Sequence, residues 1–172
     1  PHNLSLLKHN LWLSSSFMEE EKTLQKATSL ALRYLSYRPR SEFEVRGRLR
    51  RRYDEQIAES VIGRLKEQGL LDDVTFARAW SQGRMSFKPR SAALIRRQLL
   101  QKGVDRETAH TTVEALDDEE SAYKAGLRAA NSLADVDYTT FRRRLWGYLQ
   151  RRGFGQSIVR RMVGRLWEER GR

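Results

Sequence analysis

Ser36-Tyr37-Arg38-Pro39-Arg40-Ser41 recurs fifty residues later as Ser86-Phe87-Lys88-Pro89-Arg90-Ser91. Apolar residues recur at the same interval in two sets, which are Val45, Ile95 and Leu145, and Leu49, Leu99 and Leu149. Within one copy the two positions are four residues apart, so they lie on one face of a helix. A repeated hexapeptide combined with repeated apolar positions indicates an internal repeat of about fifty residues.

Each repeat is expected to hold three helices. The residue before Pro39 is pushed out of the α region, which ends the first helix. Ser41 with Glu44 three places on has the pattern of a capping box that begins the second helix. Asp54 is expected to cap the third helix, and Gly69 to end it with a left-handed turn. In the later repeats we expect helices at residues 73–85, after Ser91, after Asp105, and at 118–131, 138–152 and 156–169.

The expected architecture is an all-α, elongated and curved array of three tandem repeats, because three short helices bury little apolar surface without neighbours. The predicted repeats are residues 19–71, 72–117 and 118–172. Residues 1–18 do not fit the pattern, and Lys8 and His9 interrupt what would be the apolar part of a secretory signal. We expect a leader outside the fold, left by cloning or upstream translation, with Met18 as the natural start. An amphipathic anchor is the alternative.

Composition excludes several classes of protein. The chain has 172 residues, no cysteine and a net charge of +11, of which residues 121–172 carry +8. Without cysteine there is no disulfide scaffold, thiolate zinc site or thiol nucleophile. No apolar run approaches the roughly 18 residues that would span a bilayer. We therefore expect a soluble, cytoplasmic, monomeric protein that acts beside a polyanion.

The sequence offers no catalytic or metal-binding pattern. Its three histidines are scattered, and Gly153-Phe154-Gly155 beside a helix end is explained by turn chemistry. The acidic runs Asp72-Asp73 and Asp117–Glu120 precede helices, where capping explains them better than a divalent cation. We expect no enzymatic activity, no cofactor and no bound metal.

Basic residues form the candidate site. The residues expected to contact a polyanion are Arg38, Arg40, Lys88, Arg90, Arg96, Arg97, Lys102, Arg142, Arg143, Arg144, Arg151 and Arg152. Arginine pairs with phosphate or carboxylate through two parallel hydrogen bonds. Two simpler explanations stay open. Arg38–Arg52 could be a solvated helix face, opposed there by Glu42 and Glu44. Helix-dipole compensation would explain Arg52, Lys102 and Arg152, which end the three second helices.

Two further features of the helices carry expectations. Trp80, Trp146, Trp167 and Phe154 fall at apolar helical positions, which favours core packing over base stacking. Gly47 and Gly147 lie inside second helices at a cost of about 1 kcal/mol each. The close approach of a neighbouring helix would justify them.

The chain resembles the RecX family of bacterial recombination regulators. The most specific motif is Gly69-Leu70-Leu71-Asp72-Asp73-Val74-Thr75-Phe76-Ala77, followed by Arg84, Leu99–Val104 and Leu149–Phe154. Arg40-Ser41 with Glu44-Val45 and Leu49 resembles the signature of the first repeat. The similarity covers about residues 25–168. Two departures are Arg52, in place of a glycine often found in the first turn, and Ser91-Ala92-Ala93, which lacks a glycine.

The resemblance implies a non-enzymatic protein of tandem three-helix repeats that binds the RecA recombinase. Such proteins lie in the groove of the RecA filament on DNA and inhibit its ATPase, strand-exchange and co-protease activities. The expected partners are therefore the RecA filament and the backbone of single- or double-stranded DNA. A stand-alone DNA-binding protein, transcriptional or architectural, is the alternative, and a helical scaffold for another acidic partner is a third possibility.

Overall fold

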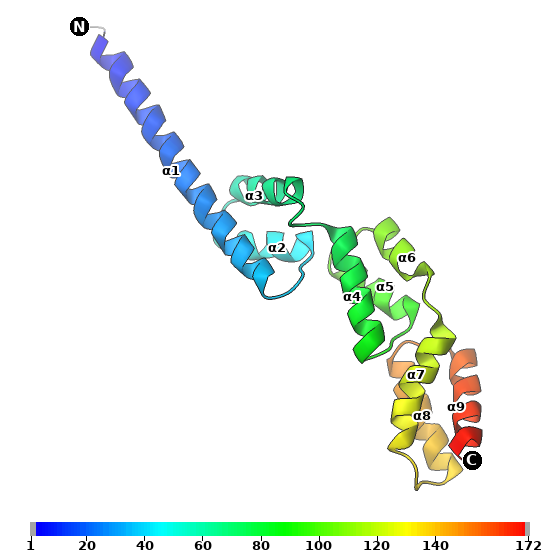
Figure 1. The fold of residues 1–172 in the computed structure, drawn as a ribbon. Helices are drawn as coiled ribbons and strands as arrows, with labels where there is room; N and C mark the ends of the chain where they lie inside the picture. The colour runs from blue at the N-terminus through cyan, green and yellow to red at the C-terminus, as the bar shows by residue number, and fades with distance from the viewer. Residues whose placement is uncertain (1–2, 171–172) are drawn as a thin grey trace. The chain divides into compact units, whose positions relative to one another are not determined.

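The computed structural model describes residues 3–170, with side chains from residue 17 onward. Within this range the chain is entirely helical between its turns, which confirms the predicted all-α repeat fold (Figure 1). The helices are α1 (Asn3–Ser36), α2 (Glu42–Leu49), α3 (Glu55–Glu67), α4 (Asp73–Phe87), α5 (Ala92–Gln101), α6 (Arg106–Glu114), α7 (Asp118–Asn131), α8 (Tyr138–Arg151) and α9 (Gln156–Arg170). The expected ends of α4, α8 and α9 were wrong by one or two residues. None of these described helices combines the length and apolar character needed to cross a membrane.

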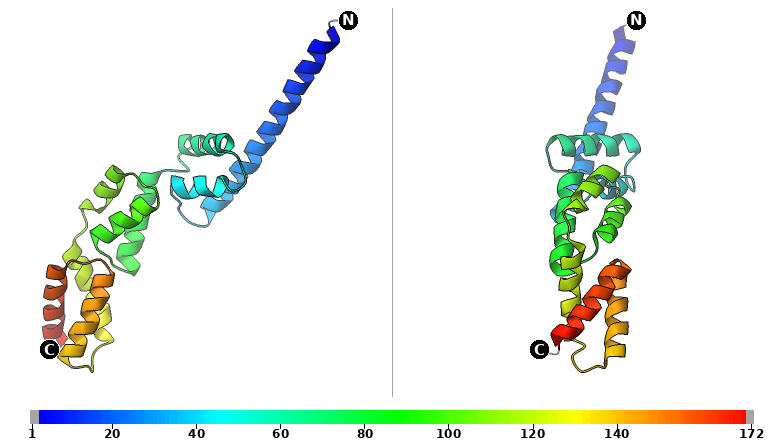
Figure 2. Two further views of the ribbon diagram at one scale, coloured as in Figure 1. Left: turned by 180° about the vertical axis from the view of Figure 1, so that it is seen from behind. Right: turned by 90° about the vertical axis from the view of Figure 1, so that its right-hand side faces the viewer.

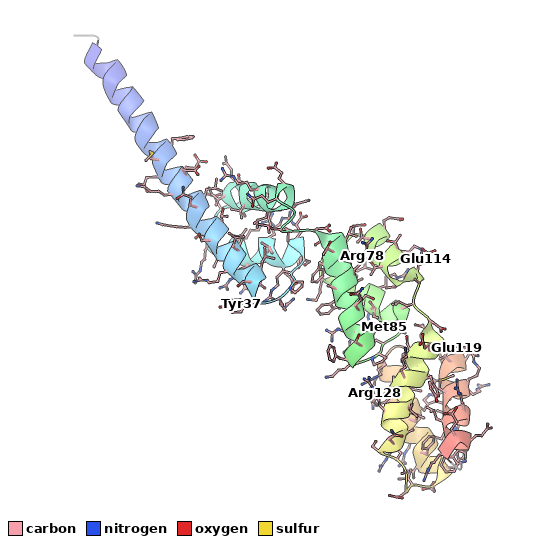
Figure 3. All side chains as sticks on the ribbon, in the orientation of Figure 1. Tyr37, Arg78, Met85, Glu114, Glu119 and Arg128 are labelled. Carbon is pink, nitrogen blue, oxygen red and sulfur yellow. The ribbon has the colours of Figure 1, made fainter. Side chains whose placement is uncertain are left out.

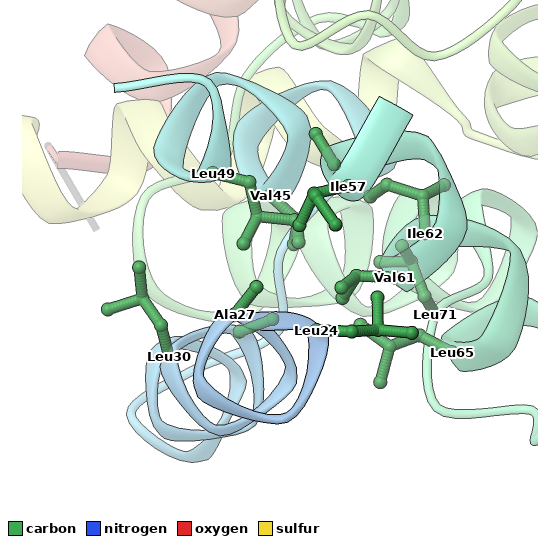
Figure 4. Packing of buried hydrophobic residues seen from close by; sticks show 12 residues of the cluster. Leu24, Ala27, Leu30, Val45, Leu49, Ile57, Val61, Ile62, Leu65 and Leu71 are labelled. Carbon is green, nitrogen blue, oxygen red and sulfur yellow. The ribbon is translucent and has the colours of Figure 1, made fainter. Parts of the chain in front are cut away.

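The first repeat, α1 to α3, belongs to a compact unit that ends at Asp73, the first unit. Its core joins apolar residues of α1, beginning at Leu24 and Ala27, to Val45 and Leu49 of α2 and to one face of α3 (Figure 4). The backbone of α1 runs without a break from Asn3 through residue 18 of the predicted leader, most of whose side chains lie outside the described residues. The origin assigned to the leader stays a prediction.

The second and third repeats, α4 to α6 and α7 to α9, share a second compact unit, residues 74–172. Figure 2 shows the six helices from behind and from the side. Each repeat has its own core: Phe76, Ile95 and Leu99 belong to the second repeat's core, and Phe141 and Leu145 to the third's. Two neighbouring small cores therefore build one unit, in keeping with stacked repeats.

One of the contacts between these two repeats lies in the turn after α8. The backbone N–H of Ser91, which caps α5, donates to the carbonyl of Arg152 at the end of α8, at 3.0 Å. Gly153 has a φ of +86°, and a Cβ there would lie 2.5 Å from Oγ of Ser91 and 2.7 Å from Cβ of Leu94. Glycine at 153 thus meets two needs, a left-handed turn and close contact with α5.

The predicted helix starts follow from local hydrogen bonds. Ser41 and Glu44 form the expected capping box on α2, and Asp54 and Asp105 accept from the third residues of α3 and α6. Ser91 caps α5 in the same way. These caps were predictable because each lies within four residues of the groups it satisfies.

Two aspartates make a second kind of helix start that the sequence did not reveal. Oδ1 of Asp73 accepts from the backbone N–H of Glu42 at 2.8 Å, within the first unit. Oδ1 of Asp118 accepts a hydrogen bond from the backbone N–H of Ala92 at 2.7 Å, within the second unit. In each case the first residue of one helix supplies an acceptor to the second helix of the preceding repeat. Burial raises the pKa of Asp73 above its ordinary value, against the effect of this hydrogen bond.

The turn after the second helix differs in the first repeat. In the later repeats Gly103 and Gly153 have φ values of +80° and +86°. The turn of the first repeat is one residue shorter. The backbone N–H of Tyr53 donates to the carbonyl of Leu49, four residues before it, whereas that of Val104 donates to the carbonyl of Leu99, five residues before it. The residues described contain no left-handed residue in this turn. This turn therefore has no left-handed position like those of Gly103 and Gly153, and the departure of Arg52 from a glycine of the family stays a prediction.

Candidate polyanion-binding site

The arginines of the first loop are engaged within the first unit. Arg38 binds Glu44 at 2.8 Å, and Arg40 lies 3.9 Å from the same carboxylate. The guanidinium of Arg40 also stacks over the ring of Tyr34, 4.0 Å from its centroid. Both predicted contact residues of this repeat thus share a carboxylate that also serves the capping box.

Arg46 of α2 and Arg50 at its C-terminal end are paired with acidic residues of α3. Arg46 binds Glu42 of its own helix and Glu59 of α3 at 2.5 and 2.7 Å, and Arg50 binds Glu59 at 3.3 Å. Hydrogen bonding by Arg46 lowers the pKa of Glu59, against partial burial. The sequence analysis set only Glu42 and Glu44 against the arginines of this segment. It therefore overstated the local positive charge, because Glu59 of α3 is a further acidic partner.

The third repeat is different, because the arginines of α8 form no ion pair with a carboxylate among the described residues, although Arg161 and Arg165 of α9 do. Arg143, Arg144 and Arg151 of α8 are exposed, and they line a groove of about 590 Å³ against α7. We call this the arginine groove. Its lining is Arg128, Ala129, Ser132, Leu133, Arg143, Arg144, Gly147, Tyr148 and Arg151. No acidic side chain lines it, so its charges are open to an anionic ligand.

The two helix-interior glycines do not serve close packing. A Cβ at Gly47 would meet nothing within 4 Å, and one at Gly147 would meet only Nη1 of Arg151 at 3.1 Å. The expected approach of a neighbouring helix was therefore wrong. Gly147 instead lines the arginine groove, and Gly47 lines the corresponding groove of the first repeat. In that groove Phe43 and Glu44 take the places that Arg143 and Arg144 have two repeats later, so the two grooves differ in charge.

Arg128 is a site residue that sequence analysis missed. It projects from the last turn of α7 beside the C-terminal end of α4 (Figure 3). Its guanidinium donates to the carbonyl of Phe87 at 2.9 Å and to that of Ser86 at 3.3 Å. A lone arginine in a last helical turn looks like dipole compensation, and only the fold shows that it lines a groove.

A second group of cations gathers around Trp80. Arg84 and Lys102 lie over its ring, 4.3 and 4.5 Å from the centroid. Burial lowers the pKa of Arg90, with repulsion from Arg84 and Arg152 adding to the effect. The structure thus brings together three predicted contacts, Arg90, Lys102 and Arg152, and adds Arg84. Spacing could have indicated Arg84, which lies one helical turn after Trp80.

This cluster continues into the arginine groove. Arg152 stacks over the ring of Tyr148 at 3.9 Å, and Tyr148 lines the groove. Nε of Arg152 is buried without a hydrogen-bond acceptor in the described structure. Arg152 also ends α8, so dipole compensation and a place beside the groove apply together.

The other predicted residues lie apart from the groove lining. Lys88 is exposed in the loop after α4, and Arg142 lies 6.0 Å from the ring centroid of Trp146. Arg96 and Arg97 line a separate groove of about 410 Å³ along α5. The predicted core role of the large aromatics is confirmed, since Phe154 is buried and the three tryptophans named above pack against the repeat cores.

The fold and the groove define a class of protein: a tandem three-helix-repeat protein with a cationic surface on its last repeat. Family models described as the RecX first, second and third three-helix domains match residues 27–65, 72–112 and 117–163. The chain belongs to the RecX family.

Individual relatives agree with this assignment. A protein named Regulatory protein RecX from Amycolatopsis mediterranei is 32% identical, covering 88% of this chain and 89% of the relative. A protein of the same name from Chlorobium limicola is 31% identical, covering 83% of this chain and 91% of the relative. The fold matches a crystal structure of RecX from Lactobacillus salivarius, with a TM-score of 0.71 at 23% identity, covering 85% of this chain and 97% of that one.

Proposed function

We propose that this protein is a non-enzymatic, cytoplasmic regulator that binds the RecA recombinase filament on DNA. Binding inhibits the ATPase, strand-exchange and co-protease activities of the recombinase. Membership of a family whose relatives are named regulatory proteins supports a regulatory role. The observation that carries the proposal is the arginine groove, which has no acidic side chain in its lining, whereas Arg38 and Arg46 of the first repeat are engaged by Glu44 and Glu59.

The electrostatics suit a ligand made of protein and nucleic acid. A filament on DNA presents phosphates and acidic side chains, both of which arginine binds through paired hydrogen bonds. The charge of residues 121–172, +8, would speed association and make it sensitive to salt. Occupation of the filament surface by a bound repeat protein would oppose the subunit movements that ATP hydrolysis and strand exchange require.

The first experiment is DNA-dependent ATP hydrolysis by the cognate RecA, titrated with this protein below one copy per recombinase subunit. We expect inhibition well below equal stoichiometry, because one bound copy would affect several neighbouring subunits. An unchanged rate, at a salt concentration where both proteins bind DNA, would contradict the proposal.

Replacing Arg142, Arg143 and Arg144 together with alanine is expected to weaken inhibition at least about tenfold, since each charge-assisted hydrogen bond lost contributes about 1.5–3 kcal/mol. The matched control is R78A/R106A/R160A, which removes the same charge from exposed residues outside the groove. Circular dichroism checks that both variants remain helical. Equal loss in both would mean that total charge, not this face, governs binding.

The alternative of a stand-alone DNA-binding protein is separated by comparing naked with recombinase-coated DNA at matched salt. The proposal expects tighter binding to the coated DNA. Clear preference for a particular naked sequence would favour the alternative.

A further inference from the structure

Phe87 is the most exposed large apolar side chain of the described residues. It ends α4 with 80% of its surface accessible, and no ring or cation contact to it exists in the described range. Other aromatic rings near the site are covered: Arg84 and Lys102 lie over Trp80, and Arg152 lies over Tyr148. Phe87 therefore offers the free aromatic face that its neighbours lack.

Arg128 connects Phe87 to the arginine groove. The same guanidinium lines the groove and donates to the carbonyls of Phe87 and Ser86, which fixes the backbone beneath the exposed ring. Arg128 thus links the groove to the segment that carries the ring, inside the second unit. Four arginines on this surface face solvent without an acidic side chain among them.

We propose that the arginine groove binds the sugar-phosphate backbone of a single-stranded nucleic acid, and that an unpaired base stacks on Phe87. Arginines track the phosphates, and an aromatic face holds a base with little regard to its identity. Gly147 leaves the middle of α8 without a side chain, so the sugar-phosphate backbone of the nucleic acid can approach the helix between Arg143 and Arg151.

The exposed ring of Phe87 favours a single-stranded nucleic acid over a duplex. In a duplex both faces of each base are already stacked, so Phe87 gains a partner only from an unpaired strand. An acidic peptide would satisfy the arginines but would leave the ring without a stacking partner. The proposal deepens the proposed function and rests on its claim that the protein meets DNA. Its tests contain no recombinase, so failure here and failure of recombinase inhibition are distinguishable.

The groove is tested by fluorescence anisotropy of a labelled oligothymidylate with the full chain over a range of salt concentrations. For R143A/R144A/R151A we expect the slope of log affinity against log salt to fall by about 2, since each phosphate contact on a single strand contributes about 0.7. R78A/R106A/R160A is the charge-matched control, and its slope should fall by less than about 1. Equal falls in the two variants would overturn the groove assignment.

Gly147→Leu gives a second test, in which a loss of binding cannot be explained by unfolding of the protein. Leucine is a better helix former than glycine, and its Cβ would displace only the mobile end of Arg151. It should fill the groove and weaken oligothymidylate binding at least about tenfold while helicity and melting temperature hold or rise. Gly47→Leu, at the corresponding place in the first repeat, should leave binding unchanged. Full binding by the Gly147→Leu protein would show that the strand does not enter the groove.

Stacking is tested by Phe87→Ala against Tyr37→Ala. Tyr37 occupies the same position of the repeated hexapeptide and is 76% exposed, so the two truncations are matched. Phe87→Ala should weaken oligothymidylate binding by about 5-fold to 150-fold, and Tyr37→Ala should not. Neither should change binding to a duplex of the same length. Equal effects of the two variants, wild-type binding that prefers the duplex, or tighter binding of poly-glutamate than of oligothymidylate would each overturn the proposal.

Discussion

At the scale of single residues, glycine positions distinguish packing from binding. Gly153 is held by both its left-handed backbone and its contact with Ser91 and Leu94. Gly147, by contrast, has a free side and lines a groove. The same residue type thus serves fold stability at one position and surface access at the other.

Gly153→Ala should destabilise the second unit by about 2–5 kcal/mol, because a left-handed alanine costs about 1–2 kcal/mol and overpacking adds about 1–3. Urea unfolding followed by tryptophan fluorescence measures this change, since three of the four tryptophans lie in that unit. Gly69→Ala is the control, because its φ is +68° but no atom lies within 4 Å of the added Cβ. Its loss of stability is measured by hydrogen exchange across the first unit, because the three tryptophans of the second unit do not report on it. If the two variants lose equal stability, the contact with α5 contributes nothing.

Local features were predictable at this scale and long-range ones were not. The caps of Ser41, Asp54 and Asp105 depend on groups three residues away, so the sequence was sufficient. The pairing of Arg46 with Glu59, and the contact of Arg128 with Phe87, join residues 13 and 41 positions apart. No spacing rule specifies such partners, because they are set by the crossing of helices.

At the scale of elements, α2 and α3 are joined by an ion-pair network. Burial alone would raise the pKa of Glu42, but hydrogen bonds from Lys66 and Arg46 outweigh it and hold this pKa below its ordinary value of 4.5. The pKa of Glu59 is also lowered, chiefly by Arg46. A depressed folded-state pKa stabilises the fold above the unfolded value, and this stabilisation is lost as pH falls through the folded value.

Glu59→Gln should therefore lower the stability of the first unit near pH 7 and leave it unchanged well below pH 4.5, where the wild-type carboxyl is protonated too. The difference at neutral pH should be about 0.3–1 kcal/mol, as for partly exposed ion pairs. Thermal melts across this pH range measure it. Glu67→Gln, at an exposed residue of α3 without an ion pair, should show no such pH-dependent difference. A difference that persists at low pH would contradict the assignment.

At the scale of the whole molecule, the repeats form two compact units with separate cores. The fold was predictable at this scale because the same apolar pattern occurs three times, which reinforces each assignment. The grouping of repeats into units was not predictable, because it depends on contacts between residues far apart in the sequence, such as those of Gly153 with Ser91 and of Arg128 with Phe87. The part of the candidate site around Trp80 likewise required the packing of the second repeat on the third.

Separate cores predict separate responses to damage. Leu49→Ala, in the fully buried core of the first unit, should cost about 2–5 kcal/mol. Hydrogen exchange should accelerate across residues 24–71 and stay unchanged across 76–166, because the two units open independently. Leu149→Ala is the reciprocal control at the equivalent residue of the third repeat. Acceleration throughout the chain from either variant would mean that the units unfold together.

Asp73 and Asp118 have a consequence for how such genes change over evolution. Each aspartate begins one helix and supplies an acceptor to the second helix of the repeat before it. A frameshift or deletion that removed a later repeat would also remove an acceptor from the repeat that remained. Loss of the third repeat would therefore cost the second repeat stability beyond the loss of the packed surface, because the N–H of Ala92 would have no carboxylate acceptor.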